Sequence, residues 1–124
     1  MKYQIQGDST PVVICELNAG ETMITESGSM VWMSPNMEMQ TNTGGGIKKA
    51  LGRLFAGESI FLNEYTPRNG RGMIAFASSF PGSIIPFEVT PDNGIIVQKR
   101  GFLAMEKGLN LSVYLQELIG TGFF

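Results

Sequence analysis

The sequence predicts an all-β sandwich in a single domain, and three observations lead to this fold class. Short apolar stretches recur every eight to twelve residues, many of them alternating with polar residues in the period of a β-strand. Turn-forming residues separate these stretches, and 16 glycines among 124 residues fit a chain with many tight turns. The apolar pattern also repeats at an offset of about 72 residues, as two copies of one β unit would. A chain of this length normally buries one self-sufficient core.

Five strands are expected in the first part of the chain. Residues 2–6 alternate between polar and apolar side chains, and residues 12–17 form a compact apolar run directly after Pro11. A turn follows, in which Gly20 supplies the positive backbone angle that other residues resist. The five predicted strands, separated by turn residues, cover residues 2–6, 12–17, 22–25, 29–33 and 36–41.

Five more strands are expected in the second part of the chain. The turn at residues 91–94 and the glycine turn at residues 106–108 are their clearest boundaries. Before them, Pro81 and Pro86 bracket an apolar pair, and we interpret this segment as a rigid crossing that folds the second repeat onto the first. The five predicted strands cover residues 73–77, 87–90, 95–99, 102–105 and 109–113.

One segment departs from the strand pattern. After the glycines at residues 44–46, four apolar residues fall at helical spacing, which predicts a short helix over residues 47–56. Isolated helices of two turns are marginal in water, so this helix must dock on another surface. Its basic residues, Lys48, Lys49 and Arg53, form a candidate basic surface. Two interpretations are open. In the first, the helix caps the core or contacts another subunit; in the second, its basic face lies on a membrane surface.

The repeat divides the domain into two units, residues 1–72 and residues 73–124. The clearest matches place residues 16–17 on 88–89 and residues 23–24 on 95–96. Apolar positions keep their spacing while loop residues change, as expected if both copies bury the same face. Chance alternation in a β-rich chain is the competing explanation. The second unit is predicted to be incomplete, because the sequence ends where the first unit still continues.

The residue types present exclude several kinds of chemistry. Histidine is absent and Cys15 is the only cysteine, which removes the usual zinc and copper ligand sets and the common Ser-His and Cys-His catalytic pairs. The 11 carboxylates are scattered rather than clustered. Residues 44–49 lack the Gly-Lys-Ser/Thr order of a phosphate-binding loop. We therefore expect no enzymatic activity, no metal and no cofactor.

Charge and cysteine usage predict a location and limit the partners. A net charge of −2 gives no general attraction to nucleic acid, so we do not expect a nucleic-acid partner. One cysteine leaves no intrachain disulfide and fits a reducing cytosol. Residues 1–6 alternate like a strand rather than like a signal peptide, and no apolar run reaches the roughly 18 residues that span a bilayer. We expect a cytoplasmic protein.

Two features predict self-association. Trp32 is the only tryptophan and lies out of phase with Val31 and Met33, which places it on the opposite face of its strand. If that face is not core, Trp32 is either an interface anchor or a stacking platform. The terminal phenylalanines offer apolar surface for association as well. The candidate interface residues are therefore Trp32, Phe123 and Phe124. The neighbouring methionines are interpreted as core fillers, with an adhesive surface as the alternative, at Met30, Met33, Met37 and Met39.

Three stretches carry a resemblance to a known family: residues 57–62 (Gly-Glu-Ser-Ile-Phe-Leu), residues 80–86 (Phe-Pro-Gly-Ser-Ile-Ile-Pro) and residues 96–104 (Ile-Val-Gln-Lys-Arg-Gly-Phe-Leu-Ala). Their order resembles that of the altered inheritance of mitochondria protein twenty-four family, over essentially the whole chain. The resemblance implies a β-sandwich of two similar halves, similar to TRAP, the RNA-binding attenuation protein of tryptophan operons, and a trimer in bacterial members. The eukaryotic relative is associated with inner-membrane organisation in mitochondria. No enzymatic activity, cofactor or active-site motif comes with the family.

Members of that family continue with further strands beyond the point where this sequence ends. Either neighbouring subunits supply the missing strands to a shortened member, or the sequence is a fragment. In both cases we expect a homo-oligomer, most simply a trimer, that acts as a non-catalytic scaffold or binding module. The alternatives are a ligand- or RNA-binding ring, by analogy with the related fold, and a peripheral membrane organiser that binds through the basic helix.

Overall fold

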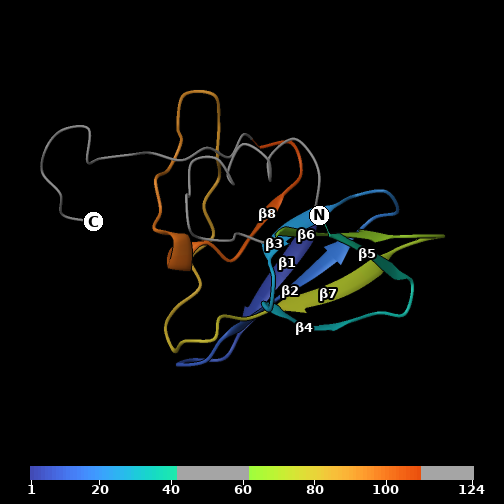
Figure 1. Ribbon diagram of the computed structural model, residues 1–124, viewed down its shortest axis with the longest axis horizontal. Helices are drawn as coiled ribbons and strands as arrows, with labels where there is room; N and C mark the ends of the chain where they lie inside the picture. Colours follow the sequence, from blue (N-terminus) through green and yellow to red (C-terminus); the bar gives the residue numbers. More distant parts are fainter. Residues whose placement is uncertain (42–61, 110–124) are drawn as a thin grey trace, which may run out of the picture.

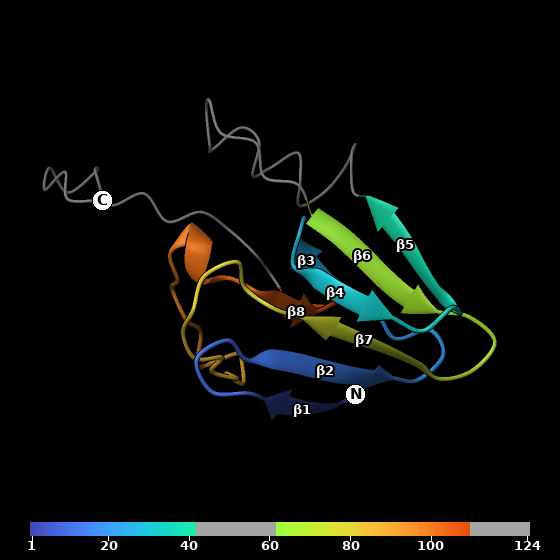
Figure 2. The same ribbon diagram turned by 90° about the horizontal axis from the view of Figure 1, so that it is seen from below.

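The computed structural model describes residues 1–41 and 62–109, which form two antiparallel four-stranded sheets packed into a sandwich (Figure 1). The first sheet contains β1 (Lys2–Gln6), β2 (Val12–Leu17), β7 (Gly72–Phe76) and β4 (Met30–Met33), side by side in that order (Figure 2). The second sheet contains β5 (Met37–Thr41), β6 (Leu62–Pro67), β3 (Met23–Glu26) and β8 (Ala104–Glu106), in that order. A 3₁₀ turn, η1 (Lys99–Gly101), precedes β8. The predicted all-β fold class is confirmed.

Successive strands mostly change sheets, so that hydrogen-bonded neighbours are distant in the sequence. The chain passes from β2 in the first sheet to β3 in the second, back to β4, and again to β5. As a result β2 pairs with β1 and β7, while β3 pairs with β6 and β8. The two sheets are therefore tied together by the turns between the strands as well as by the core.

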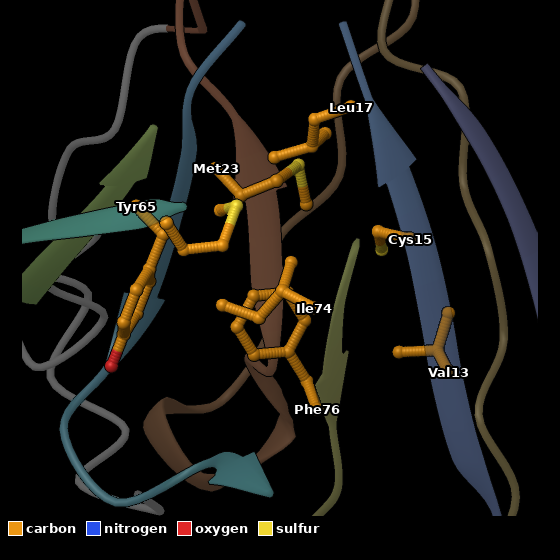
Figure 3. Close-up of a cluster of buried hydrophobic side chains, with 8 residues drawn as sticks. Val13, Cys15, Leu17, Met23, Tyr65, Ile74 and Phe76 are labelled. Atoms are coloured by element: carbon orange, nitrogen blue, oxygen red, sulfur yellow. The ribbon is translucent and has the colours of Figure 1, made fainter. Parts of the chain in front are cut away.

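The core lies between the sheets and draws side chains from both (Figure 3). Alternate residues of β2 are buried, as its apolar pattern predicts. The rings of Tyr65 from the second sheet and Phe76 from the first meet edge to face, with centroids 6.0 Å apart. The cluster is completed by Val13, Cys15, Leu17, Met23, Met37 and Ile74. At the margin of this core Gly72 leaves no room for a side chain, because a Cβ there would lie 2.5 Å from Met37 Sδ.

Two crossing turns are joined by side-chain hydrogen bonds. The Asn36 amide donates to the carbonyl oxygens of Arg68 (3.1 Å) and Arg71 (2.8 Å), and its Oδ1 accepts from Ser34 Oγ (2.8 Å). Ser34 Oγ in turn accepts from the Met73 amide (2.9 Å). The β4–β5 turn is thereby fixed to the β6–β7 turn, in which Asn69 adopts the left-handed conformation at φ 60°.

Thr25 attaches the end of the described chain to β3. Its side chain is fully buried and donates to the Leu103 carbonyl (2.7 Å), directly before β8. The Thr22 carbonyl accepts from the Lys107 amide (3.0 Å), and Lys107 Nζ lies 3.1 Å from a Glu64 carboxylate oxygen. Segments about 80 residues apart in the sequence are thus held together.

Most of the expected strands are present, and three differences are informative. The strand β6 was not expected. The predicted strands at residues 87–90 and 95–99 are wrong, because their only pairing within the described chain is an isolated bridge between Thr90 and Asn93. The predicted strand 102–105 begins later, as β8. The expected helix at residues 47–56 and most of the expected strand 109–113 fall outside the described residues. Within residues 1–41 and 62–109, no helix is long and apolar enough to cross a membrane.

Candidate interaction surfaces

Trp32 lies on the outer face of the first sheet, in an apolar row that crosses three strands. It is paired with Ala75 of β7, which is paired with Ile14 of β2. Directly paired residues of antiparallel strands project to the same face, and the core residues of β2 and β7 project to the other. The indole is 42% exposed. This is the side of the strand on which the alternation placed it.

Val31 and Met33 do not both face the core as the alternation implied. The register of β4 against β7 shifts between Met30 and Trp32, and this irregularity leaves Val31 56% exposed. Met33 pairs with the core residue Ile74, but its side chain is exposed at the rim of the sandwich. Of the four methionines interpreted as core fillers, Met37 is buried and Met30 packs against the core, whereas Met33 and Met39 are exposed.

We call this patch the Trp32 surface: Val31, Trp32 and Met73 are exposed, Ile14 is half-buried, and Ala75 between Trp32 and Ile14 is fully covered. Met73 is 41% exposed and pairs with Glu16 of β2. Beside it, Arg71 Nη1 lies 2.7 Å from a Glu16 carboxylate oxygen. The surface is therefore apolar in its middle and carries a compensated ion pair at its edge, which is the usual arrangement of a protein contact.

A second apolar surface is formed by residues 83–98, which we call the arm. Its two halves run side by side from one end of the sandwich (gold to orange in Figure 1) and meet at the Thr90–Asn93 bridge. Ile84 packs against the core and anchors the arm, while the rest is exposed. The exposed apolar residues are Ile85 (82%), Phe87 (45%), Val89 (38%), Ile95 (51%), Ile96 (72%) and Val97 (48%). The apolar pattern of this segment was visible in the sequence, where it predicted paired strands. The structure shows an exposed apolar surface instead.

A shallow hollow of about 280 Å³ opens beside the N-terminus. Its floor includes the buried side chains of Leu17 and Met23, and Glu21 and Lys107 stand at its mouth. The Glu21 carboxylate accepts from the Asn18 amide (2.7 Å), and the N-terminal ammonium lies 3.2 Å away. The Asn18 hydrogen bond, more than the ammonium, lowers the pKa of Glu21. Glu21 is thus a stable anion, and the hollow is smaller than typical ligand pockets.

The described residues offer little reactive chemistry. Cys15 is buried, and burial together with the negative charge of Glu106 raises its pKa to about 11, so it remains a thiol. Among residues 1–41 and 62–109, no group of three or more His, Cys, Asp and Glu side chains is placed to hold a metal ion. Glu21, one of the two carboxylates that line the hollow, has a lowered pKa, which makes it a weaker general base.

Three basic side chains of the described residues pair with carboxylates. Arg68 forms two hydrogen bonds with Glu38, at 2.6 and 3.3 Å, and Arg71 and Lys107 pair with carboxylates as described above. The guanidinium carbon of Arg100 lies 5.7 Å from the centroid of the Phe80 ring, at the base of the arm. The remaining sequence candidates lie outside the described residues: Lys48, Lys49, Arg53, Phe123 and Phe124.

The fold is similar to that of a solved bacterial protein. The crystal structure of protein SPYM3_0169 from Streptococcus pyogenes matches with a TM-score of 0.64 and 28% sequence identity, over 86% of this chain and 50% of that chain. The uncharacterized protein M6_Spy0233 of Streptococcus pyogenes serotype M6 is 33% identical over 86 residues, which are 64% of this chain and 34% of that protein. The chain spans about a third of the latter and half of the former.

The family described as mitochondrial biogenesis AIM24 matches residues 3–124. This match extends over nearly the whole chain and includes the three stretches that carry the resemblance in the sequence. Both bacterial relatives agree with the resemblance to uncharacterised bacterial members. The chain belongs to the AIM24 family.

Proposed function

We propose that this chain is a non-catalytic cytoplasmic scaffold that works as a homo-oligomer, with the Trp32 surface as its subunit contact. The observation that carries the proposal is the exposed apolar group of Val31, Trp32 and Met73 on the neighbouring strands β4 and β7 of the first sheet. Tryptophan is among the residue types enriched at the energetic centre of protein contacts. An exposed tryptophan beside Val31 and Met73 is therefore better suited to a protein partner than to solvent.

A non-catalytic role is supported by the chemistry of the described residues. The thiol of Cys15 is buried, and the Glu21 carboxylate is engaged by its own turn. A trimer is the stoichiometry that the family resemblance implies, and a threefold ring would join each Trp32 surface to a different surface of the next subunit. The basic helix and the terminal phenylalanines remain predicted contacts to a membrane or a neighbouring subunit.

The mass of the protein in solution tests this proposal. Light scattering over a wide dilution series is expected to give a fixed multiple of the 13.5 kDa chain. Trp32→Glu places a charge in the centre of the contact, so we expect a lower mass at unchanged circular dichroism. Tyr3→Glu is the matched control, because Tyr3 is 52% exposed on the same sheet but projects to the other face. A mass that Trp32→Glu leaves unchanged would overturn the proposed contact.

A further inference from the structure

Two asparagines of the chain, Asn69 and Asn93, are followed by glycine. An asparagine in this position can lose ammonia without an enzyme, because the amide nitrogen of the next residue attacks its side-chain carbonyl carbon. Glycine allows this attack most readily, since it has no Cβ to hinder the approach of its nitrogen. Both asparagines lie in exposed turns, so access to water does not distinguish them. The two sites differ in how firmly their backbone is held.

The reaction needs a particular backbone geometry. The five-membered succinimide ring closes only when rotation about the Cα–C bond of the asparagine brings the next amide nitrogen against the side-chain carbonyl carbon. This rotation turns the peptide plane between asparagine and glycine and displaces the residues on either side. In a turn that is held at both ends, hydrogen bonds must break before the ring can close.

The turn that contains Asn69 is held at both ends by Asn36. The Asn36 side-chain amide donates to the Arg68 carbonyl (3.1 Å), directly before Asn69, and to the Arg71 carbonyl (2.8 Å), two residues after it. The Arg68 amide donates in return to the Asn36 carbonyl (3.0 Å). Asn69 and Gly70 therefore lie between two points that are fixed to another turn of the molecule.

The turn that contains Asn93 is held only by a residue of the same turn. The Asn93 carbonyl accepts from the Thr90 amide (3.1 Å), and the Asn93 amide donates to the Thr90 carbonyl (3.0 Å). Both residues are exposed at the tip of the arm, which stands away from the two sheets (Figure 1). The arm packs against the core at Ile84, far from this tip. The peptide plane after Asn93 can therefore turn without disturbing the sandwich.

We propose that Asn93 is a site of spontaneous deamidation in the folded protein, and that Asn36 protects Asn69 from the same reaction. The Gly94 nitrogen forms a bond to Asn93 Cγ, the bond from Cγ to Nδ2 breaks, and Nδ2 leaves as ammonia with the proton of the Gly94 amide. Water then opens the succinimide at either of its two carbonyls. The net reaction consumes one water, releases one ammonia and leaves aspartate or isoaspartate at position 93. It does not depend on the contact through Trp32.

Both products change the tip of the arm. Each places a new carboxylate directly after Asp92, so that two negative charges lie next to each other in the turn. Isoaspartate also lengthens the main chain by one carbon atom, which removes the register of the two hydrogen bonds between Thr90 and position 93. An isoaspartate in an exposed turn is the chemical class of substrate that isoaspartyl methyltransferases accept.

Rates measured on the intact chain test the proposal. The protein is incubated at mildly alkaline pH, folded or in urea, and then cleaved after glutamate, which gives peptides 65–88 and 89–106 with one asparagine each. Mass spectrometry follows the gain of one dalton. In the folded protein Asn93 should react at least about ten times faster than Asn69, since each hydrogen bond that must break lowers the reactive population roughly twofold to tenfold. In urea the two rates should be similar. Equal rates in the folded protein would overturn the proposal.

Variants of Asn36 test the protection of Asn69. Asn36→Ala and the isosteric Asn36→Asp both remove the two hydrogen bonds that the side-chain amide donates. In whichever variant keeps the circular dichroism of the wild type, Asn69 should react at nearly the rate seen in urea, while the rate at Asn93 is unchanged. Glu38→Ala is the matched control, because it removes the ion pair with Arg68 and keeps the Asn36 hydrogen bonds. A slow Asn69 in both folded Asn36 variants would contradict the protective role.

A second readout identifies the product at position 93. Isoaspartyl methyltransferase with labelled S-adenosylmethionine should methylate the incubated wild type and not Asn93→Ser, which has no amide to lose. Gly94→Ala should slow the reaction and keep the fold, because a Cβ at Gly94 meets no atom within 4 Å. Equal methylation of the wild type and Asn93→Ser would place the isoaspartate elsewhere and overturn the assignment.

Discussion

Cys15 shows how the position of one residue determines its chemistry. Its thiol sits in the core, and burial, followed by the nearby negative charge of Glu106, raises its pKa from 9.0 to about 11. The folded state thus holds the proton more tightly than the unfolded state. The resulting stability is fully present below pH 9 and is lost as the pH rises toward 11.

We expect two consequences of the Cys15 pKa. The folded protein at pH 8 should not react with an aromatic disulfide reagent, and reaction should begin only when urea unfolds it. The urea midpoint of the wild type should also fall relative to that of Cys15→Ala between pH 9 and 11. A constant difference between the two midpoints across this range would mean that the thiol does not titrate as its burial requires.

The side of the strand on which Trp32 lies could be predicted, but not its neighbours. Alternation places successive residues on opposite faces, and Trp32 follows this rule. The register shift between Met30 and Trp32 exposes Val31. Such an irregularity depends on how β4 meets β7, a strand some 40 residues away, and local sequence does not encode it.

At the scale of elements, the joined turns are expected to contribute more to stability than the ion pair beside them. Asn36→Ala removes two hydrogen bonds to backbone carbonyls and one from Ser34, and should cost about 1–3 kcal/mol of unfolding free energy. Glu38→Ala is the control. It removes the exposed ion pair with Arg68 in the same region, which is worth about 0–1 kcal/mol. Equal losses in urea unfolding would contradict this ranking.

Some strands could be predicted from the sequence and others could not, and the two groups differ in where their pairing partners lie. The alternation of β2 is strong because one face is core and the other is not. The pattern of β6 is weak, because Asn63, Glu64 and Thr66 interrupt it while Leu62 and Tyr65 are buried on opposite faces. Residues 87–90 and 95–99 have strand composition but no neighbouring strand in the described chain. Composition predicts the capacity to pair, and pairing itself needs a partner.

At the scale of the whole molecule, the proposed Trp32 contact predicts a specific assembly. Three subunits joined head to tail through the Trp32 surface would form a closed ring with three times the mass of the 13.5 kDa chain. Trp32→Glu should reduce this ring to the monomer, while Tyr3→Glu should leave its mass unchanged. Light scattering on both variants distinguishes this ring from an assembly held by another surface, which Trp32→Glu would leave intact.

Because the chain passes back and forth between the two sheets, it can fold only in a certain order. Neither β2 nor β3 can complete its ladder from local residues, since β2 needs β7 and β3 needs both β6 and β8. During synthesis the ribosome must therefore release residue 106 before the second sheet closes. Until then the residues of β3 that the finished sandwich buries remain open to solvent. We expect slow folding, as in other β-proteins dominated by distant pairings, and protection of the nascent chain by a chaperone.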